Sequence, residues 1–254
     1  MTTTIDDLII LGRAVPELIS NGRTTVCVAG YSPTYGMIRI YPTRPDSPLQ
    51  QWSIVRVRVE RNPNDNRVES WKLAGSTDWD NINRNITKVD KLPHHQRLPL
   101  VHSLASPCVS LLNQPPYRSL GIVEPVIYRW WFDENEQYYK AHQPMFDIIE
   151  PAVIRTKRDY PMQPRFEYRC GNQCQSRSRH DQQLLEWGCF EFIKKCHDYN
   201  QINGIWRNMG IGSKEWRHFF VVGNQANQRT SFMVINVIRQ KITDVQSMIP
   251  FDRL

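Results

Sequence analysis

Alternating hydrophobic and polar residues dominate the first third of the chain and predict β-strands. The run WSIVRVRVERN alternates strictly, with its valines on one side and Arg56 and Arg58 on the other, which is the period of a half-buried strand. Residues 24–29 and 37–41 are apolar and β-branched, and a loop rich in Gly, Pro and Ser separates them. They predict two further strands, so we expect a β-rich N-terminal half.

The rest of the chain mixes strand-like segments with one helical pattern. SLGIVEPVIYRWWF and FEYRC are rich in β-branched and aromatic residues, and HFFVVGN with SFMVINVIRQ predicts a closing hairpin. Between them, residues 181–197 place apolar side chains at i, i+4, i+7 and i+11, which predicts a long helix with a buried stripe. These elements predict an α+β fold.

The regions between these elements give weaker signals. Residues 79–89 predict a short helix, and His94 and His95 are assigned to a turn-rich loop. The loop-rich sequence near 145–155 suggests a boundary between a β-rich region, 1–148, and a C-terminal region, 149–254.

The composition says more about which class of partner the protein binds than about any reaction that it catalyses. The 254 residues carry a formal net charge of +7 and include 27 aromatic residues, 8 Trp, 10 Tyr and 9 Phe. A basic, aromatic-rich chain favours polyanionic partners, nucleic acids above all, although solubility alone also explains the charge. No segment approaches the roughly 20 apolar residues that a membrane helix needs. The N-terminus lacks a basic signal-peptide region and the six cysteines are sparse, so we expect a cytoplasmic protein with free or metal-bound thiols.

One short motif carries metal-ligand spacing. Cys170 and Cys174 are followed by His180, three donors within eleven residues that suit zinc. A structural zinc site needs a fourth ligand. Candidates for it are Cys27, Cys189, Cys196 and His197. The alternative is a pair of half-buried thiols that precede a helix.

Basic and aromatic residues on the predicted strands suggest a binding face. Arginine suits phosphate contact and aromatic rings suit base stacking, although an ordinary solvated strand face gives a similar pattern. The candidates on this face and in its turns are Arg39, Tyr41, Trp52, Arg56, Arg58 and Arg67. Arg177 and Arg179 add a basic loop beside the metal motif.

Several blocks in a fixed order resemble a known family. They are TVCVAG with GMIRIYP, NRVESW, SLGIVEP, the Cys170–His180 motif followed by Glu186–Trp187, and HFFVVGN with SFMVINV. Together they resemble a poorly characterised bacterial family found near phage-defence and DNA-modification genes. The resemblance implies an OB-like or related small barrel in the N-terminal half, association with nucleic acid, DNA in particular, and protein partners from the same gene cluster.

Three functions stay open on this basis. The first is a nucleic-acid-binding protein of DNA modification or defence, with zinc on the Cys/His motif. The second is an enzyme acting on a nucleobase, with Cys27 as nucleophile and Glu69 or Glu186 handling protons. The third is an interaction subunit that makes no contact with nucleic acid.

Overall fold

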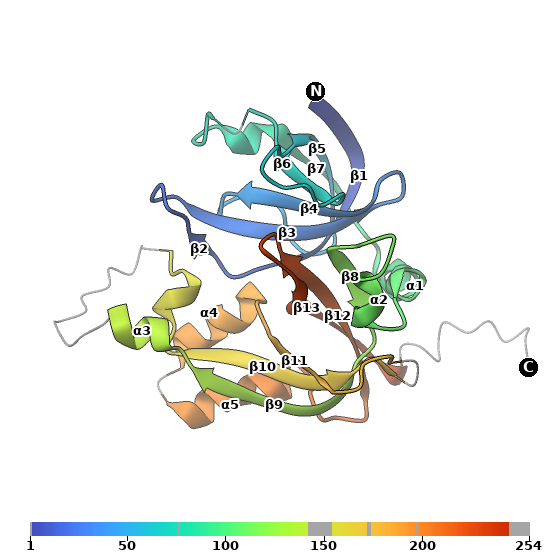
Figure 1. Ribbon diagram of the computed structural model, residues 1–254, viewed down its shortest axis with the longest axis vertical. Coiled ribbons are helices and arrows are strands. Elements are labelled where there is room, and N and C mark those ends of the chain that lie inside the picture. The colour runs from blue at the N-terminus through green and yellow to red at the C-terminus, as the bar shows by residue number, and fades with distance from the viewer. Residues whose placement is uncertain (1, 76, 142–153, 172–173, 197, 244–254) are drawn as a thin grey trace, which may run out of the picture.

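A computed structural model describes residues 2–75, 77–141, 154–171, 174–196 and 198–243. The N-terminal strands form a barrel at one end of the molecule, and the remaining strands and helices form a second layer beneath it (Figure 1). The α+β class predicted from the sequence is therefore confirmed.

The barrel closes through five strands. They are β1 (Thr2–Arg13), β3 (Thr24–Ser32), β4 (Gly36–Thr43), β5 (Ser53–Arg61) and β6 (Ser70–Leu73). Their order is β1-β3-β4-β6-β5, and β5 pairs back onto β1. Only the β4–β6 pair is parallel, and this is the strand order of an OB-type barrel. The short β2 (Glu17–Leu18) adds to β3, and β7 (Ile86–Lys91) adds to β5.

The alternating sequence of β5 places its apolar side chains inside the barrel and its charged side chains outside. Val55, Val57 and Val59 are fully buried inside it, whereas Arg56 and Arg58 are exposed on its outer surface. The barrel interior forms its own hydrophobic cluster, to which β1, β3 and β4 contribute apolar side chains. A strand that buries one face and solvates the other gives this period-two pattern.

Two three-stranded antiparallel sheets build the second layer. One joins β8 (Leu120–Val123), β12 (Trp216–Gln225) and β13 (Gln228–Lys241). The other joins β9 (Val126–Glu134), β10 (Met162–Arg169) and β11 (His180–Gln183). In the described ranges the helices are α1 (His94–Leu104), α2 (Val109–Leu112), α3 (Glu136–Ala141), α4 (Trp187–Lys195) and α5 (Tyr199–Asn208), and 3-10 turns lie at Ile82–Asn85 and Lys157–Asp159.

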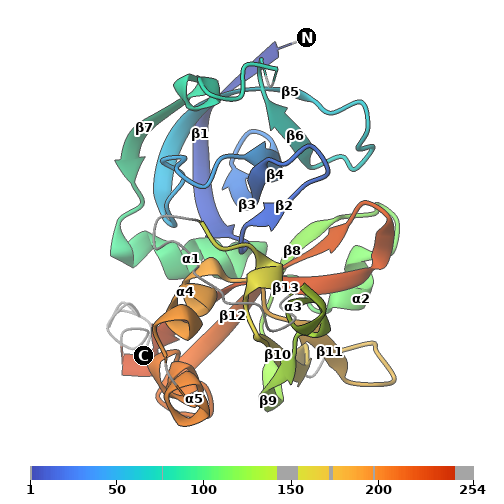
Figure 2. The ribbon, with the colours of Figure 1, turned by 90° about the vertical axis from the view of Figure 1, so that its left-hand side faces the viewer.

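The barrel rests on the β12–β13 hairpin (Figure 2). Asn236 on β13 donates to the carbonyl of Leu11 on β1 at 2.7 Å. Gly12 is needed beside this bond, because a Cβ there would lie 2.5 Å from the Cβ of Asn236. A second and larger hydrophobic cluster runs through the lower layer and reaches β1 and β3. The two layers therefore share packing as well as hydrogen bonds.

Three local predictions were wrong. Residues 79–89 form no α-helix: after one 3-10 turn, the β-branched run from Ile86 pairs with β5. His94 and His95 open α1, which buries Leu98 and Val101 against the core. The predicted helix 181–197 is shorter, because 180–183 pair with β10 and α4 begins only at Trp187.

The expected boundary between the two regions falls mostly on residues 142–153, outside the described ranges. β8 and β9, which precede it, pair with strands that follow it. No helix in the described ranges combines the length and apolar character that crossing a bilayer requires.

Candidate metal centre

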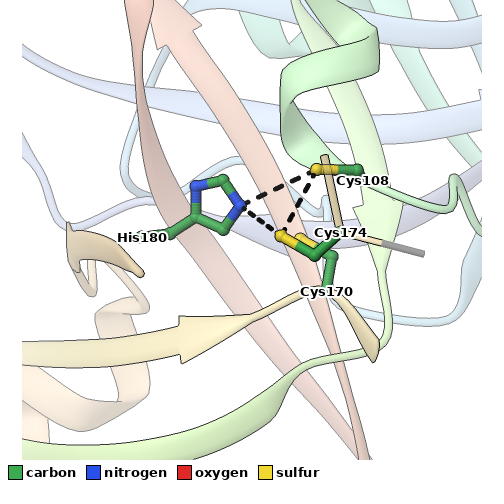
Figure 3. Close-up of side chains that lie close together, drawn as sticks. All are labelled: Cys108, Cys170, Cys174 and His180. Atoms are coloured by element: carbon green, nitrogen blue, oxygen red, sulfur yellow. Dashed lines mark hydrogen bonds between the residues drawn. The ribbon is translucent and has the colours of Figure 1, made fainter. Parts of the chain in front are cut away.

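Four side chains of types that commonly bind metal ions lie close together at one end of the lower layer. They are Cys108, Cys170, Cys174 and His180, and one donor atom from each lies within 4.8 Å of all the others. The Sγ atoms of Cys108 and Cys174 are 3.7 Å apart, and Nε2 of His180 lies 3.4 Å from Cys174 and 3.8 Å from Cys108. The three sulfurs and the imidazole nitrogen point toward one another (Figure 3).

Cys108 reaches the site from the start of α2. Its Sγ caps the helix by accepting the Ser110 backbone N–H at 3.4 Å. The Val109 N–H, one residue earlier, donates to Sγ of Cys170 at 3.4 Å. Two backbone donors therefore point at two of the three sulfurs, and such donors favour the thiolate form that binds a metal.

The β10–β11 pair supplies the other three donors. Cys170 directly follows β10, and Gly171 then turns the chain with φ of +56°, where no atom lies near a hypothetical Cβ. His180 begins β11 opposite Tyr168, and the two rings are 5.2 Å apart. This register fixes the imidazole so that Nε2 faces the sulfurs.

Burial and local hydrogen bonds shift the pKa values of the donors in different directions. Burial, and secondarily Arg169, lowers the pKa of His180, so its imidazole is neutral and keeps a lone pair at physiological pH. Burial raises the pKa of Cys170. Burial also acts to raise the pKa of Cys108, but hydrogen bonds from Ser110, Gln175 and Cys174 outweigh it, and the net shift is downward.

The sequence identified three of these four residues. The fourth donor is Cys108, and none of the candidates named from the sequence takes its place: Cys27 lies on β3, Cys189 is buried in α4, and Cys196 ends that helix. His197 lies outside the described residues. Cys108 stands alone after Pro107, 62 residues from its nearest co-ligand in sequence, so no spacing signal could have paired it with the motif.

The three catalytic candidates occupy separate environments. Burial is the main cause that raises the pKa of Cys27, so its thiol stays protonated. Glu69 is buried, and its two oxygens accept the backbone N–H and the hydroxyl of Ser119 at 2.9 and 3.0 Å. Glu186 accepts the Val237 N–H at 3.2 Å. The hydrogen bonds of the described residues do not join these three side chains.

The nucleic-acid candidates divide into an inward and an outward group. Arg39 is 3% exposed, and its Nη atoms donate to the carbonyls of Asn224 and Ser119 at 2.7 and 2.9 Å. Three others are also held within the molecule: Trp52, Tyr41 and Arg67. Four lie on the surface: Arg56 with an ion pair to Asp6, Arg58, Arg177, and Arg179 with an ion pair to Glu167.

Comparison with solved structures gives a loose match. One structure, described as "Structure of murine DNA binding protein bound with ds DNA", is 8% identical with a TM-score of 0.32, over 94% of this chain and 97% of that one. No curated protein matches the chain.

Two family profiles match consecutive parts of the chain. Residues 4–102 match a domain of unknown function, DUF8758, and residues 112–254 match another, DUF8757. Cys108 lies between the two matched ranges, whereas its three co-ligands lie inside the second. Because the second profile covers more than half of the chain, this protein belongs to the family described as domain of unknown function DUF8757.

Proposed function

We propose that this protein binds nucleic acid through the outer face of the β9–β10–β11 sheet, and that a zinc ion at the metal centre holds that face in shape. The observation that carries the proposal is a basic loop whose two ends are both metal-ligand residues. Residues 175–179 lie between Cys174 and His180 and include Arg177 and Arg179.

The donor geometry fits zinc. With Zn–S and Zn–N bonds of about 2.3 and 2.05 Å, a tetrahedral site separates its sulfurs by about 3.8 Å and a sulfur from a nitrogen by about 3.6 Å. The separations between Cys108, Cys174 and His180 are 3.7, 3.8 and 3.4 Å. A Cys₃His set is a familiar structural zinc set, and no ligand position is left open for catalysis. Zinc here would hold the loop and the hairpin together.

The adjoining sheet face offers rings and guanidinium groups together. The guanidinium carbon of Arg179 lies 4.1 Å from the ring centre of Tyr128, which is 48% exposed, and that of Arg129 lies 4.7 Å from Trp131. With Arg165, Arg169 and Arg177, this face and its loop carry five arginines against three acidic residues, Asp133, Glu167 and Asp181. Aromatic rings beside arginine suit base stacking next to phosphate contact.

Fluorescence anisotropy with labelled single-stranded DNA, double-stranded DNA and RNA of one sequence tests this function. We expect affinity to fall steeply with salt concentration, with a slope in log units of about −0.7 for each phosphate neutralised on a single strand. Tyr128→Ala and Arg179→Ala should each weaken binding about fivefold or more, which corresponds to 1 kcal/mol or more per contact.

The matched control is Arg58→Ala, because Arg58 is also exposed but lies on the barrel. Affinity unchanged by both sheet-face substitutions and lost with Arg58→Ala would move the interface to the barrel. Absence of binding to all three nucleic acids at 50 mM salt would refute the function.

We also propose that the protein works in bacterial DNA modification or defence, together with partners from the same gene cluster. The order of sequence blocks from TVCVAG to SFMVINV supports this setting. Deletion of the gene in a host strain should change phage plating or DNA-modification levels, and unchanged values for both would contradict it.

A further inference from the structure

A cavity of about 340 Å³ lies between the barrel and the β12–β13 hairpin, away from the metal centre. Its barrel side consists of β3, β4 and the connections that follow β1 and β5, and its other side is the end of the hairpin. The residues that carry the argument are Glu17, Thr25, Arg39, Tyr41, Ala226 and Met233.

The position of this cavity on the barrel is informative. In OB-type barrels the second and third strands, with the loops after the first and the fourth, form the ligand-binding face. Those parts are here β3, β4, the segment with Glu17, and the segment with Arg67, and all four line the cavity. The β12–β13 turn covers what would otherwise be an open groove. The space left suits one small ligand rather than a continuous strand.

A buried cation lines the cavity without an acidic partner. Arg39 is 3% exposed, and among the described residues no carboxylate lies within ion-pair distance of it. Its two Nη atoms donate to backbone carbonyls, whereas its buried Nε has no hydrogen-bond partner. Arg67, the other arginine of the lining, is neutralised by Asp65 at 2.6 Å. A buried charge is costly unless it is paired, so Arg39 favours an anionic ligand.

The remaining lining combines apolar walls with hydrogen-bonding groups. Val15, Leu185, Met233 and Ile235 supply aliphatic and thioether surface. Thr25 and Tyr41 both line the cavity, and their hydroxyls lie 3.3 Å apart. Glu17, a third lining residue, carries a carboxylate that can accept N–H groups of a ligand. Apolar walls with a few convergent polar groups are typical of small-molecule binding sites.

We propose that this cavity binds a single nucleotide, with the base against the apolar wall and the phosphate drawn toward Arg39. The inference extends the proposed function, on which it rests for the choice of a nucleotide over other anionic heterocycles. The nucleotide can come from two sources, a free mononucleotide or one extruded from a bound strand.

Isothermal titration calorimetry on the full chain tests the site with adenosine, guanosine, cytidine and uridine monophosphates. At least one of them should bind with a Kd below 1 mM, and the corresponding nucleoside and inorganic phosphate should each bind at least tenfold more weakly. Arg39→Gln should abolish the preference for the monophosphate over the nucleoside.

Substitution of the buried Arg39 could unfold the protein, so two variants in the exposed β12–β13 turn provide a second test. Ala226 is exposed and lines the cavity mouth, whereas Asn227 is exposed in the same turn and does not line it. Ala226→Trp should weaken mononucleotide binding at least tenfold, and Asn227→Trp should leave it unchanged. Wild-type affinity in the Ala226→Trp variant, or no mononucleotide binding to folded wild-type protein, would overturn the proposal.

Competition between a mononucleotide and a labelled strand distinguishes the two sources of the nucleotide. It also distinguishes the proposed cavity site from the proposed sheet-face function. If mononucleotide displaces a labelled strand from the wild type but not from Ala226→Trp, the nucleotide comes from the strand. If strand binding is insensitive to both mononucleotide and Ala226→Trp, the ligand is a free mononucleotide. A protein that binds mononucleotide and no strand would refute the sheet-face function and retain the cavity.

Discussion

Cys108 has two roles, as the fourth donor of the metal centre and as the capping residue of α2. Its thiol lies 3.7 Å from Cys174 and 3.8 Å from Nε2 of His180, and it is fully buried at the start of a four-residue helix. So short a helix gains little from its own hydrogen bonds. A metal bond to its capping residue would therefore stabilise both the helix and the site.

Substitution of Cys108 by serine tests this directly. We expect Cys108→Ser to lower zinc affinity at least 100-fold, as much as Cys174→Ser does, because either change leaves three ligands for a tetrahedral ion. The measurement is metal content after dialysis, followed by competition with a chromogenic chelator. Cys196→Ser is the control, because Cys196 ends α4, its thiol donates to the Phe192 carbonyl, and it is not one of the four clustered donors. Full zinc retention in Cys108→Ser would remove Cys108 from the ligand set.

Glu186 makes stability depend on pH. Burial raises the pKa of Glu186 to about 7 from an ordinary value of 4.5, although the Val237 N–H and Arg239 oppose the shift. The folded protein therefore holds this proton more tightly than the unfolded chain, so the free energy of unfolding contributed by this group falls as pH rises from about 4.5 to 7. Below that window the contribution is fully present.

Urea denaturation of Glu186→Gln checks the sign. The glutamine keeps an acceptor for Val237 but carries no charge, so the variant should be more stable than wild type by about 1 to 3 kcal/mol at pH 8. The two proteins should be nearly equal at pH 4.5. A difference that does not change with pH would show that the carboxyl titrates normally.

At the scale of the element, the β10–β11 pair both presents the basic loop and supplies three donors. Gly171 makes the turn after β10 with φ of +56°, a conformation that costs other residues about 1 kcal/mol and that asparagine tolerates best. Nothing lies within 4 Å of a Cβ built there. The cost of a substitution is therefore conformational and not steric.

Gly171→Ala should lower the free energy of unfolding by about 1 kcal/mol and weaken zinc binding, and Gly171→Asn should recover part of both losses. Gly22→Ala is a matched control, because Gly22 has φ of +80° with equally open space and lies in the turn between β2 and β3, away from the metal centre. It should reproduce the loss in denaturant stability without changing zinc affinity. An alanine variant with wild-type zinc affinity would mean that the turn does not position Cys170.

The elements that the sequence predicted well are those whose burial shows in their own hydrophobic pattern, on one face or on both. β5 alternates because its valines fill the barrel. β12 and β13 are long apolar runs because the barrel packs on their sheet from one side and β10 packs on it from the other. The helix expected at 79–89 failed because pairing of Ile86 with β5 decides the conformation of that segment. Local periodicity does not record such a partner, since it depends on the topology of the barrel.

The site residues likewise fall into those that the local sequence identified and those that depend on distant contacts. Cys170, Cys174 and His180 are close in sequence, and their spacing was sufficient to identify them. Cys108 and the burial of Arg39 depend on contacts between segments 61 or more residues apart. The strand pattern around Arg39 resembled a solvated binding face, whereas the hairpin of the lower layer covers that face of the barrel.

At the scale of the whole molecule, the metal centre and the barrel belong to different cores. Cys108 and Cys170 are part of the large cluster of the lower layer, with Cys174 packed against it, whereas the barrel interior is a separate cluster without any of the ligands. Loss of zinc should therefore loosen one layer and spare the other, since stability is distributed in such cooperative units.

Hydrogen–deuterium exchange after removal of zinc with a chelator would measure this division. Peptides that cover α2, β10 and β11 should lose protection tenfold or more, which corresponds to about 1.4 kcal/mol of local stability. Peptides from β1, β3, β4 and β5 should exchange as in the zinc-loaded protein. Addition of zinc, but not of magnesium, should restore protection, because thiolate and imidazole donors select the softer ion. Equal deprotection of barrel and lower layer would show that the contacts of Asn236 and Arg39 across the interface bind both into a single unit.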